Sequence, residues 1–217
     1  MWSAGPAPRR PVGGRPRLLR PGFFLARGQK IGLFGGSFDP AHDGHAHVAR
    51  TALRRLGLDR VIWLVSPQNP LKPRSADLKQ RMASAARFAH GPSMIVSNVE
   101  TRIGSAYTVD TLRALKARFP GVHFVWIMGA DNLSSLHHWR GWTQIVHEAP
   151  VAVIARPGSA IKSRLAPATV RFSRYRLHSR QARLLALTPA PSWLYIRVPL
   201  NFSSSSAIRA KLGQSGR

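Results

Sequence analysis

The sequence of residues 30–45 is KIGLFGGSFDPAHDGH. Residues 31–34 form a short apolar run typical of a buried strand, and a helical pattern begins at Gly44. Between them, Gly35 and Gly36 allow backbone N–H groups to approach a bulky anion, because no side chain stands in the way. The unpaired N–H groups at the start of the helix, together with its positive dipole end, face the same place. The segment therefore predicts a phosphate-binding loop between a strand and a helix.

Two histidines bracket the start of this helix. His42 and His45 can both point at the expected anion, which makes the site cationic and leaves it without a carboxylate base. Zinc is the alternative ligand for a group of His42, His45 and His47, but helical spacing puts His45 and His47 on different faces. We therefore expect no metal held by protein side chains. The loop also lacks the GxxxxGK[ST] pattern, which excludes a Walker-type site.

Short apolar runs alternate with helical patterns through the rest of the chain. Fully apolar strands that alternate with helices are typical of a parallel sheet covered on both faces, so the expected fold class is α/β with a doubly wound parallel sheet. Ligands of such folds bind at the carboxyl ends of the strands. The expected strands are residues 31–34, 61–65, 94–96, 122–128, 151–155 and 193–198, and the expected helices are residues 44–56, 77–88, 108–118, 134–146 (broken), 180–187 and 205–212.

Composition excludes several classes of protein. The chain has 217 residues, of which 44% are hydrophobic, enough for one substantial core and too many for a mostly disordered chain. The absence of cysteine excludes disulfides, a thiolate nucleophile and a thiolate metal site. No apolar run is long enough to cross a bilayer. We expect a soluble cytoplasmic protein with no membrane partner.

The chain is strongly basic. Lysine and arginine number 33 against 8 acidic residues, which gives a net charge of +25. Such a charge indicates either a polyanionic partner or a drift in composition, and the basic residues are scattered along the chain, as drift predicts. Residues 1–29 contain no acid and several prolines, so we expect a flexible basic arm ahead of one domain over residues 30–217. An incorrectly assigned start and a transit peptide are alternative interpretations of this segment.

Two motifs together resemble a known family. GGSFDPAHDGH at residues 35–45 is similar to the GGxFDPxHxGH signature of the nucleotidyltransferases related to class I aminoacyl-tRNA synthetases. SSSSAIR at residues 203–209 is similar to their second signature, ISSTxIR. Ser203 stands where the family has isoleucine, and Ser206 stands where it has threonine and keeps the hydroxyl. The resemblance implies a Rossmann-like nucleotidyltransferase fold.

Four further segments resemble the bacterial nicotinate mononucleotide adenylyltransferases. The resemblance runs from about Lys30 to Leu212 and implies transfer of AMP from ATP to nicotinate mononucleotide, which gives nicotinate adenine dinucleotide and pyrophosphate in NAD biosynthesis. The segments are WIMGADNL at 126–133 with HWRGW at 138–142, SPQNPLK at 66–72, SAYTVDTL at 105–112 and ARPG at 155–158.

The resemblance also implies roles for individual residues. His45 would contact the α-phosphate of ATP, and His42 and Arg209 would bind its β- and γ-phosphates. Mg²⁺ would be bound mainly through the ATP phosphates. The implied ATP-binding residues are Gly35, Gly36, Ser37, Phe38, His42, His45, Asp131, Ser204, Ser205, Ser206 and Arg209. The implied acceptor-binding residues are Asn69, Lys72, Thr108, Arg156 and Trp139, of which Trp139 would stack on the nicotinate ring and Arg156 would bind the acceptor phosphate.

Two other functions stay open at this stage. A sister nucleotidyltransferase would use another phosphorylated acceptor, such as nicotinamide mononucleotide or pantetheine phosphate. A basic RNA-binding protein is the alternative from a different class, favoured by the net charge and the basic arm. The paired motifs favour the adenylyltransferase, with ATP and nicotinate mononucleotide as partners and no specific nucleic acid. A homo-oligomer is compatible with the sequence.

Overall fold

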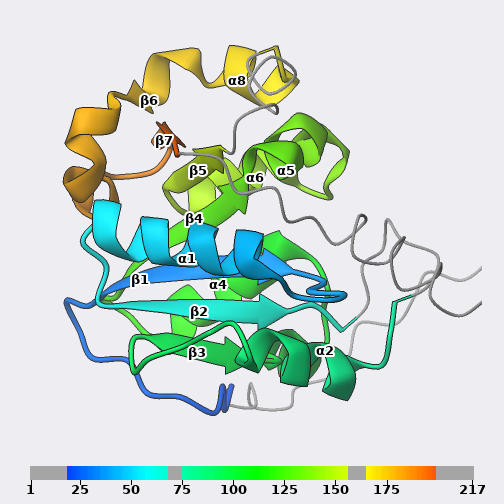
Figure 1. The fold of residues 1–217 in the computed structure, drawn as a ribbon. Helices are drawn as coiled ribbons and strands as arrows, with labels where there is room; N and C mark the ends of the chain where they lie inside the picture. The colour runs from blue at the N-terminus through cyan, green and yellow to red at the C-terminus, as the bar shows by residue number, and fades with distance from the viewer. Residues whose placement is uncertain (1–18, 68–74, 156–164, 199–217) are drawn as a thin grey trace, which may run out of the picture.

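The computed structural model describes residues 19–67, 75–155 and 165–198. Seven strands within these ranges form one sheet in the order β3-β2-β1-β4-β5-β7-β6, and every pairing is parallel (Figure 1). The expected α/β class and doubly wound parallel sheet are confirmed. The strands are β1 (Lys30–Gly36), β2 (Arg60–Val65), β3 (Met94–Ser97), β4 (His123–Gly129), β5 (Val151–Ala155), β6 (Arg176–Leu177) and β7 (Trp193–Arg197).

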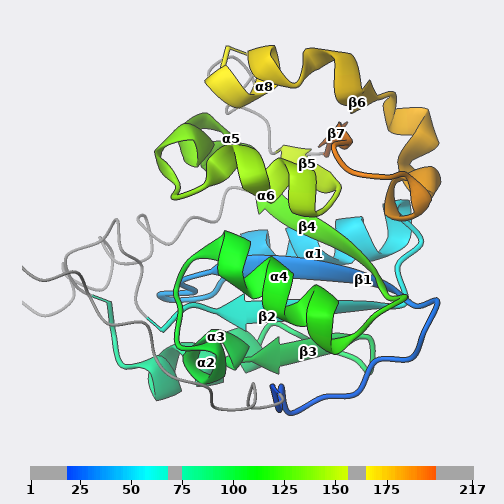
Figure 2. The same cartoon turned by 180° about the vertical axis from the view of Figure 1, so that it is seen from behind.

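Helices cover both faces of the sheet. Helix α1 crosses the front in Figure 1, and α4 lies on the opposite face in Figure 2. The helices are α1 (Asp43–Arg55), α2 (Leu78–Ala86), α3 (Val99–Ile103), α4 (Thr108–Arg118), α5 (Ala130–Ser135), α6 (Trp142–Glu148) and α8 (Pro167–Arg171), with 3₁₀ turns η1 (Leu136–His138), η2 (Ser173–Tyr175) and η3 (Ser179–Leu187).

The differences from the sequence-based expectation lie in short or irregular elements. Helices α3 and α8, the turn η2 and the two-residue strand β6 were not expected, because elements this short carry too few residues for a periodic pattern. Residues 179–187 form a 3₁₀ helix rather than the expected α-helix. The expected helix 205–212 lies outside the described residues.

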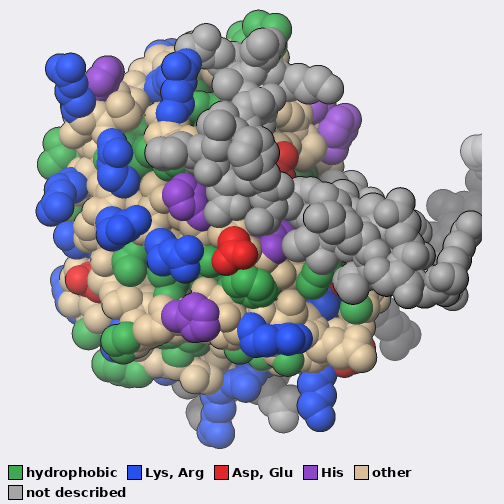
Figure 3. Space-filling model, viewed as in Figure 1, with side chains coloured by type: hydrophobic (Ala, Val, Ile, Leu, Met, Phe, Trp, Pro, Cys, Tyr) green, Lys and Arg blue, Asp and Glu red, His purple; other side chains and the backbone are tan. Residues whose placement is uncertain are grey.

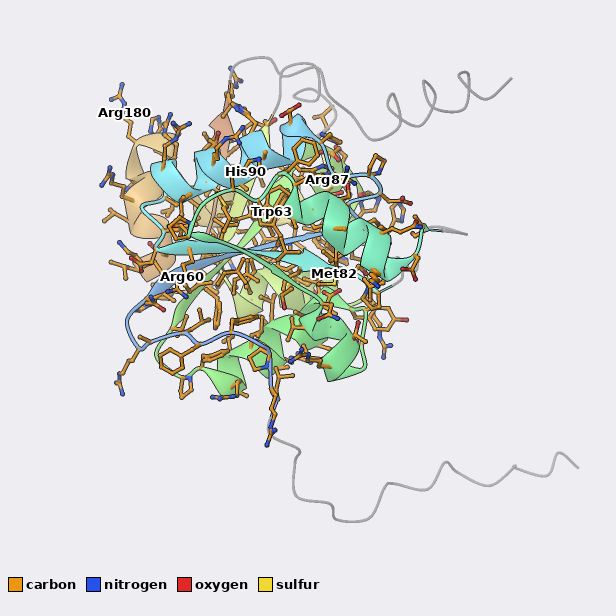
Figure 4. All side chains as sticks on the ribbon, turned by 60° about the horizontal axis from the view of Figure 1, so that its bottom comes forward. Arg60, Trp63, Met82, Arg87, His90 and Arg180 are labelled. Carbon is orange, nitrogen blue, oxygen red and sulfur yellow. The ribbon has the colours of Figure 1, made fainter. Side chains whose placement is uncertain are left out.

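The two faces of the sheet bury alternate residues of each central strand. In β2, Trp63 and Val65 join the cluster under α1, whereas Ile62 and Leu64 join the cluster under α4. Because successive side chains of a strand point to opposite faces, a sheet covered on both sides needs apolar residues at every position. This explains why the strands are continuous apolar runs in the sequence. Figure 4 labels Trp63 within this packed interior.

The chain ahead of β1 packs against the domain. Leu25 is buried in the core under α4, and the Phe23 ring stacks on Phe119 with the ring centroids 5.9 Å apart. The Arg118 Nε donates to the carbonyl of Leu19 at 3.0 Å. Within the described residues, the chain from Leu19 to Lys30 therefore packs against the domain, because apolar side chains such as Leu25 are buried in its core. Residues 1–18 of the expected arm lie outside the described residues.

Within the described ranges, none of the helices combines the length and the apolar character needed to cross a bilayer.

Candidate active site

The loop between β1 and α1 brings the two motif histidines together. The backbone of His42 is extended, with φ −157° and ψ 171°, and its carbonyl accepts the first helical hydrogen bond from the His45 N–H at 2.9 Å. His42 is the N-cap residue, so both imidazoles lie at the positive end of α1. Their ring centroids are 3.8 Å apart. His42 is 4% exposed and His45 is half-buried, with the Phe38 ring 5.1 Å away.

The glycine pair has a packing reason as well as the expected ligand-binding one. A Cβ atom built on Gly35 would lie 2.5 Å from the Trp126 ring of the neighbouring strand β4. A Cβ on Gly36 would lie 3.0 Å from the ring of Phe38, whose own backbone has a positive φ of 49°. Real Cβ atoms do not come as close as 2.5 Å to a fixed ring, so residue 35 must be glycine while Trp126 fills this space.

Asp131 lies at the same edge of the sheet as the glycine loop. Strand β4 pairs with β1 and ends at Gly129, and Asp131 follows in the first turn of α5. The Asp131 Oδ1 lies close to the Gly129 backbone: a Cβ atom built on Gly129 would lie 2.4 Å from this oxygen. From β1 the chain first builds the sheet to one side, through β2 and β3, and then to the other side, from β4 onward. The carboxyl ends of β1 and β4 therefore form the topological switch point, where such sheets bind nucleotides.

Thr108 and Trp139, expected to bind the acceptor, are carried by two segments that meet. Thr108 is the first residue of α4, and Trp139 directly follows η1 and is half-buried. Next to them, the Arg140 guanidinium lies over the Tyr107 ring at 4.6 Å. A Cβ on Gly141 would lie 3.4 Å from Val109, which brings the same two segments together at a second point.

Several expected site residues lie outside the described residues. These are Asn69, Lys72, Arg156, Ser204, Ser205, Ser206 and Arg209. Their roles remain predictions that rest on the sequence motifs.

A buried arginine that the sequence did not single out lies directly behind the loop. Arg81 of α2 is 2% exposed. Its Nη1 donates to the carbonyls of Ser37 at 3.0 Å and Ser66 at 2.6 Å, its Nη2 donates to Pro67 at 2.7 Å, and its Nε donates to Ala76 at 2.8 Å. Burial lowers the pKa of Arg81, while the nearby Asp39 and Asp77 raise it. A guanidinium still keeps its charge in proteins, so these are charge-assisted hydrogen bonds.

One sequence signal could have revealed Arg81. It lies three residues after Leu78 and four before Ala85, which places it on the buried face of α2 among apolar neighbours. An arginine at such a position must satisfy its donors inside the protein.

A buried carboxylic acid lies on the other side of Ser66. Glu100 is 4% exposed, accepts a hydrogen bond from Thr111 Oγ1 at 3.1 Å, and is hydrogen-bonded to the Ser66 side chain. Burial raises the pKa of Glu100 to about 7, although the hydrogen bonds from Thr111 and Ser66 lower it. Glu100 therefore ties the end of β2 to helix α4.

The fold and this site define a class of protein: an α/β nucleotide-binding protein with a glycine–histidine loop at its switch point. The chain belongs to the cytidylyltransferase-like family, whose model matches residues 33–211.

Curated relatives resemble the chain over most of its length. It is 60% identical over 184 residues to a protein of Caulobacter sp. named probable nicotinate-nucleotide adenylyltransferase, covering 84% of this chain and 97% of the relative. A protein of the same name from Roseobacter denitrificans is 54% identical over 197 residues, covering 90% of this chain and 99% of the relative.

A solved structure shares the fold. The Plasmodium falciparum nicotinic acid mononucleotide adenylyltransferase complexed with NaAD superposes with a TM-score of 0.64 at 18% identity, covering 84% of this chain and 83% of that one. At this identity the likeness concerns the fold alone.

Proposed function

We propose that this protein is a nicotinate-nucleotide adenylyltransferase that transfers AMP from ATP to nicotinate mononucleotide in NAD biosynthesis. A phosphate oxygen of the mononucleotide attacks the α-phosphorus of ATP, the bond from that phosphorus to the bridging oxygen breaks, and pyrophosphate leaves. The observation that carries the proposal is the pair of imidazoles 3.8 Å apart at the N-terminus of α1, where β1 ends. The close relatives named for this activity support it.

The chemistry fits a site that has cationic side chains and no carboxylate placed as a general base. The attacking phosphate is already an anion, so no proton has to be removed before attack. Catalysis then consists of aligning two polyanions and stabilising charge at the crowded phosphorus and on the leaving pyrophosphate. His45 contacts the α-phosphate and His42 the outer phosphates, assisted by the dipole of α1. Arg209 and the hydroxyls of residues 204–206 complete the phosphate site in this proposal.

The remaining residues hold the two nucleosides and the acceptor phosphate. Asp131 accepts hydrogen bonds from the adenosine ribose, since a carboxylate can bind two neighbouring hydroxyls. Trp139 stacks on the nicotinate ring, and Thr108 with its neighbouring backbone holds the nicotinate carboxylate. Asn69 and Lys72 lie along the acceptor, and Arg156 binds its phosphate.

Magnesium enters this proposal as part of the ATP substrate. Across residues 19–67, 75–155 and 165–198, no three His, Asp or Glu side chains gather into a group that could hold a metal ion. In this proposal Mg²⁺ is held mainly by phosphate oxygens of ATP and by water, the oxygen ligands that it prefers. Since the enzyme uses ATP and makes an NAD precursor, we place it in the cytoplasm.

A panel of acceptors tests the function. Pyrophosphate release is measured with ATP and, separately, nicotinate mononucleotide, nicotinamide mononucleotide and pantetheine phosphate. We expect kcat/KM for the nicotinate compound to exceed each of the others by at least about 10-fold, because donors arranged for a carboxylate lose a partner when an amide replaces it. A clear preference for another acceptor would identify a sister enzyme. No turnover of any acceptor, with tight binding of RNA, would favour the RNA-binding alternative.

A further inference from the structure

The buried guanidinium of Arg81 joins two loops that serve different substrates. It donates to the carbonyl of Ser37, in the loop proposed to bind ATP, and to those of Ser66 and Pro67, at the end of β2 where the acceptor segment begins. The bonds to Ser37 and Ser66 come from the same nitrogen, Nη1. Ser37 and Ser66 are 44 and 15 residues away from Arg81 in sequence. The sheet brings the two loop starts together, because Gly36 of β1 pairs with Val65 of β2 and the Ser66 N–H donates to the Gly36 carbonyl at 3.1 Å, and Arg81 bonds to both from α2.

We propose that Arg81 is a positioning residue for adenylyl transfer, which orients the backbone of Ser37 in the ATP loop and of Ser66 and Pro67 after β2 as in-line attack requires. This inference rests on the function proposed above. Arg81 lies behind the loops and reaches them through backbone carbonyls, so its effect on the reaction passes through the two loops rather than through contact with either nucleotide.

The Ser37 carbonyl has a specific consequence for the anion site. The peptide between Ser37 and Phe38 is trans, and in a planar trans peptide the C=O and the N–H point in opposite directions. When Arg81 holds the Ser37 oxygen on one side, the Phe38 N–H must point to the other. Phe38 has a positive φ of 49°, so its backbone is in the sparsely populated left-handed region and needs external support. The hydrogen bond from Arg81 provides that support.

Two further contacts from the α2 region hold the same loop. The Ala41 N–H donates to the Ser84 hydroxyl at 3.0 Å, and the Ala76 N–H donates to the Asp39 carboxylate at 3.3 Å. The loop between β1 and α1 is therefore fastened to α2 and its N-terminal flank at three places. Of these three contacts, the one made by Arg81 also extends to the end of β2.

Ser66 is hydrogen-bonded from two sides, which fixes the position of the residue that Arg81 holds. Its carbonyl accepts from Arg81, and its side chain is hydrogen-bonded to the buried Glu100, which in turn is bonded to Thr111 of α4. Helix α4 begins at Thr108, the residue proposed to hold the nicotinate carboxylate. A continuous set of hydrogen bonds thus runs from the ATP loop through Arg81 and Ser66 to the helix of the acceptor site.

Arg81→Lys is the central test, because it keeps the charge and replaces the planar fork by a single ammonium. In the wild type, three guanidinium nitrogens donate four hydrogen bonds to four carbonyls. The single ammonium nitrogen of lysine cannot reach all four carbonyls. We expect kcat per folded molecule, with both substrates saturating, to fall by about 10- to 100-fold, the effect of a misplacement near 1 Å, with each KM changed by less than about threefold. Circular dichroism gives the folded fraction used to correct kcat.

The matched control is Arg87→Lys. Arg87 is the residue that follows α2, is exposed, and is labelled in Figure 4; the same arginine-to-lysine change there should leave kcat within about twofold of wild type. Wild-type turnover with nicotinate mononucleotide is measured first, so that failure of the proposed function is separated from failure of this inference.

A second variant keeps the inference testable if the lysine variant does not fold. In Arg81→Ala, added methylguanidinium should refill the vacated space and raise both the melting temperature and kcat. A melting temperature restored without kcat would overturn the inference, because it would show that the guanidinium serves only stability. Wild-type kcat per folded molecule in Arg81→Lys would overturn it as well.

Discussion

At the scale of single residues, the proposed chemistry depends most on the imidazole pair. His42 and His45 lie on one turn of backbone, where the His42 carbonyl accepts the hydrogen bond that starts α1. Their separation is therefore determined by local helix geometry and their surroundings by the Phe38 ring. In the proposed mechanism, a change at His45 removes one donor to the α-phosphate and leaves this local geometry in place.

We expect His45→Ala to lower kcat at least about 100-fold, because the donor is lost where charge develops in the transition state. Steady-state pyrophosphate release measures kcat, and thermal unfolding checks that the fold is kept. The matched control is His47→Ala on the same helix, which should stay within about threefold of wild type. Near-normal turnover of the His45 variant would remove this residue from the mechanism.

Glu100 predicts a pH dependence of stability. Burial raises its pKa in the folded protein from an ordinary 4.5 to about 7, so the folded state binds the proton more tightly than the unfolded chain does. The contribution of this proton to stability is fully present below pH 4.5 and is lost as the pH rises through 7. The free energy of unfolding should fall by about 3 kcal/mol over this range from this group alone.

Glu100→Gln should remove that dependence, since a neutral amide can still accept from Thr111. We expect the variant to gain stability relative to wild type on going from pH 5 to pH 8, as measured by urea unfolding at both values. The comparison of the two proteins cancels the other titrating groups. An unchanged stability difference between pH 5 and pH 8 would show that Glu100 is already ionised at neutral pH in the folded protein.

At the scale of helices and strands, contacts between two elements determine which residue can occupy a position. Gly35 of β1 is required by the Trp126 ring of β4, and the start of α4 meets the segment before α6 through its neighbouring residues Tyr107 and Val109. In both cases a residue of one element is shaped by the side chain of another.

Gly35→Ala should destabilise the protein by about 1–3 kcal/mol, because its Cβ would meet Trp126 at 2.5 Å in a closely packed core. Trp126→Phe shortens the ring, so the double variant should lose less stability than the sum of the two single changes. Urea unfolding of the four proteins measures this coupling. Strictly additive losses would show that the ring and residue 35 do not compete for the same space.

Trp139→Ala should raise KM for nicotinate mononucleotide by about 10-fold and leave KM for ATP within about twofold, since stacking on the nicotinate ring concerns one substrate only. Initial rates with each substrate varied in turn measure both constants. Equal changes in the two constants would place Trp139 in the packing of the η1–α6 segment instead.

The charge is a property of the whole molecule. All eight acidic residues lie within the described ranges; Glu148 pairs with Arg113 and Lys116, and Glu100 is buried. Figure 3 shows lysine and arginine side chains spread over the face that carries α1, with few acidic ones. The net charge of +25 should therefore act as a diffuse field that attracts polyanions without sequence preference.

We expect single-stranded RNA to bind weakly, with an affinity that falls at least about 10-fold between 50 and 200 mM salt. Fluorescence anisotropy measures the binding, and a variant that lacks residues 1–18 should bind less tightly while its kcat stays unchanged. Tight binding that persists at high salt would contradict the interpretation of the charge as a diffuse field.

The segment from Lys30 to His45 and the strands on either side could be predicted from the amino-acid sequence, because their signals are local. An apolar run, a glycine pair and a histidine ahead of a helix each depend on neighbours a few residues away. The parallel sheet followed from continuous apolar strands for the same reason. One-turn elements such as α3 and the packing of Leu25 carried no comparable signal.

The hydrogen-bond partners of Arg81 and Glu100 became visible only in three dimensions. These partners lie between 5 and 44 residues away, and the sheet order that brings β1 next to β2 and β4 depends on how whole helices pack on the two faces. Periodicity reports which face of an element is buried, but not which element covers it. Consecutive residues thus determine the predicted phosphate loop, whereas the hydrogen bonds from Arg81 that join it to the end of β2 form because distant segments fold against one another.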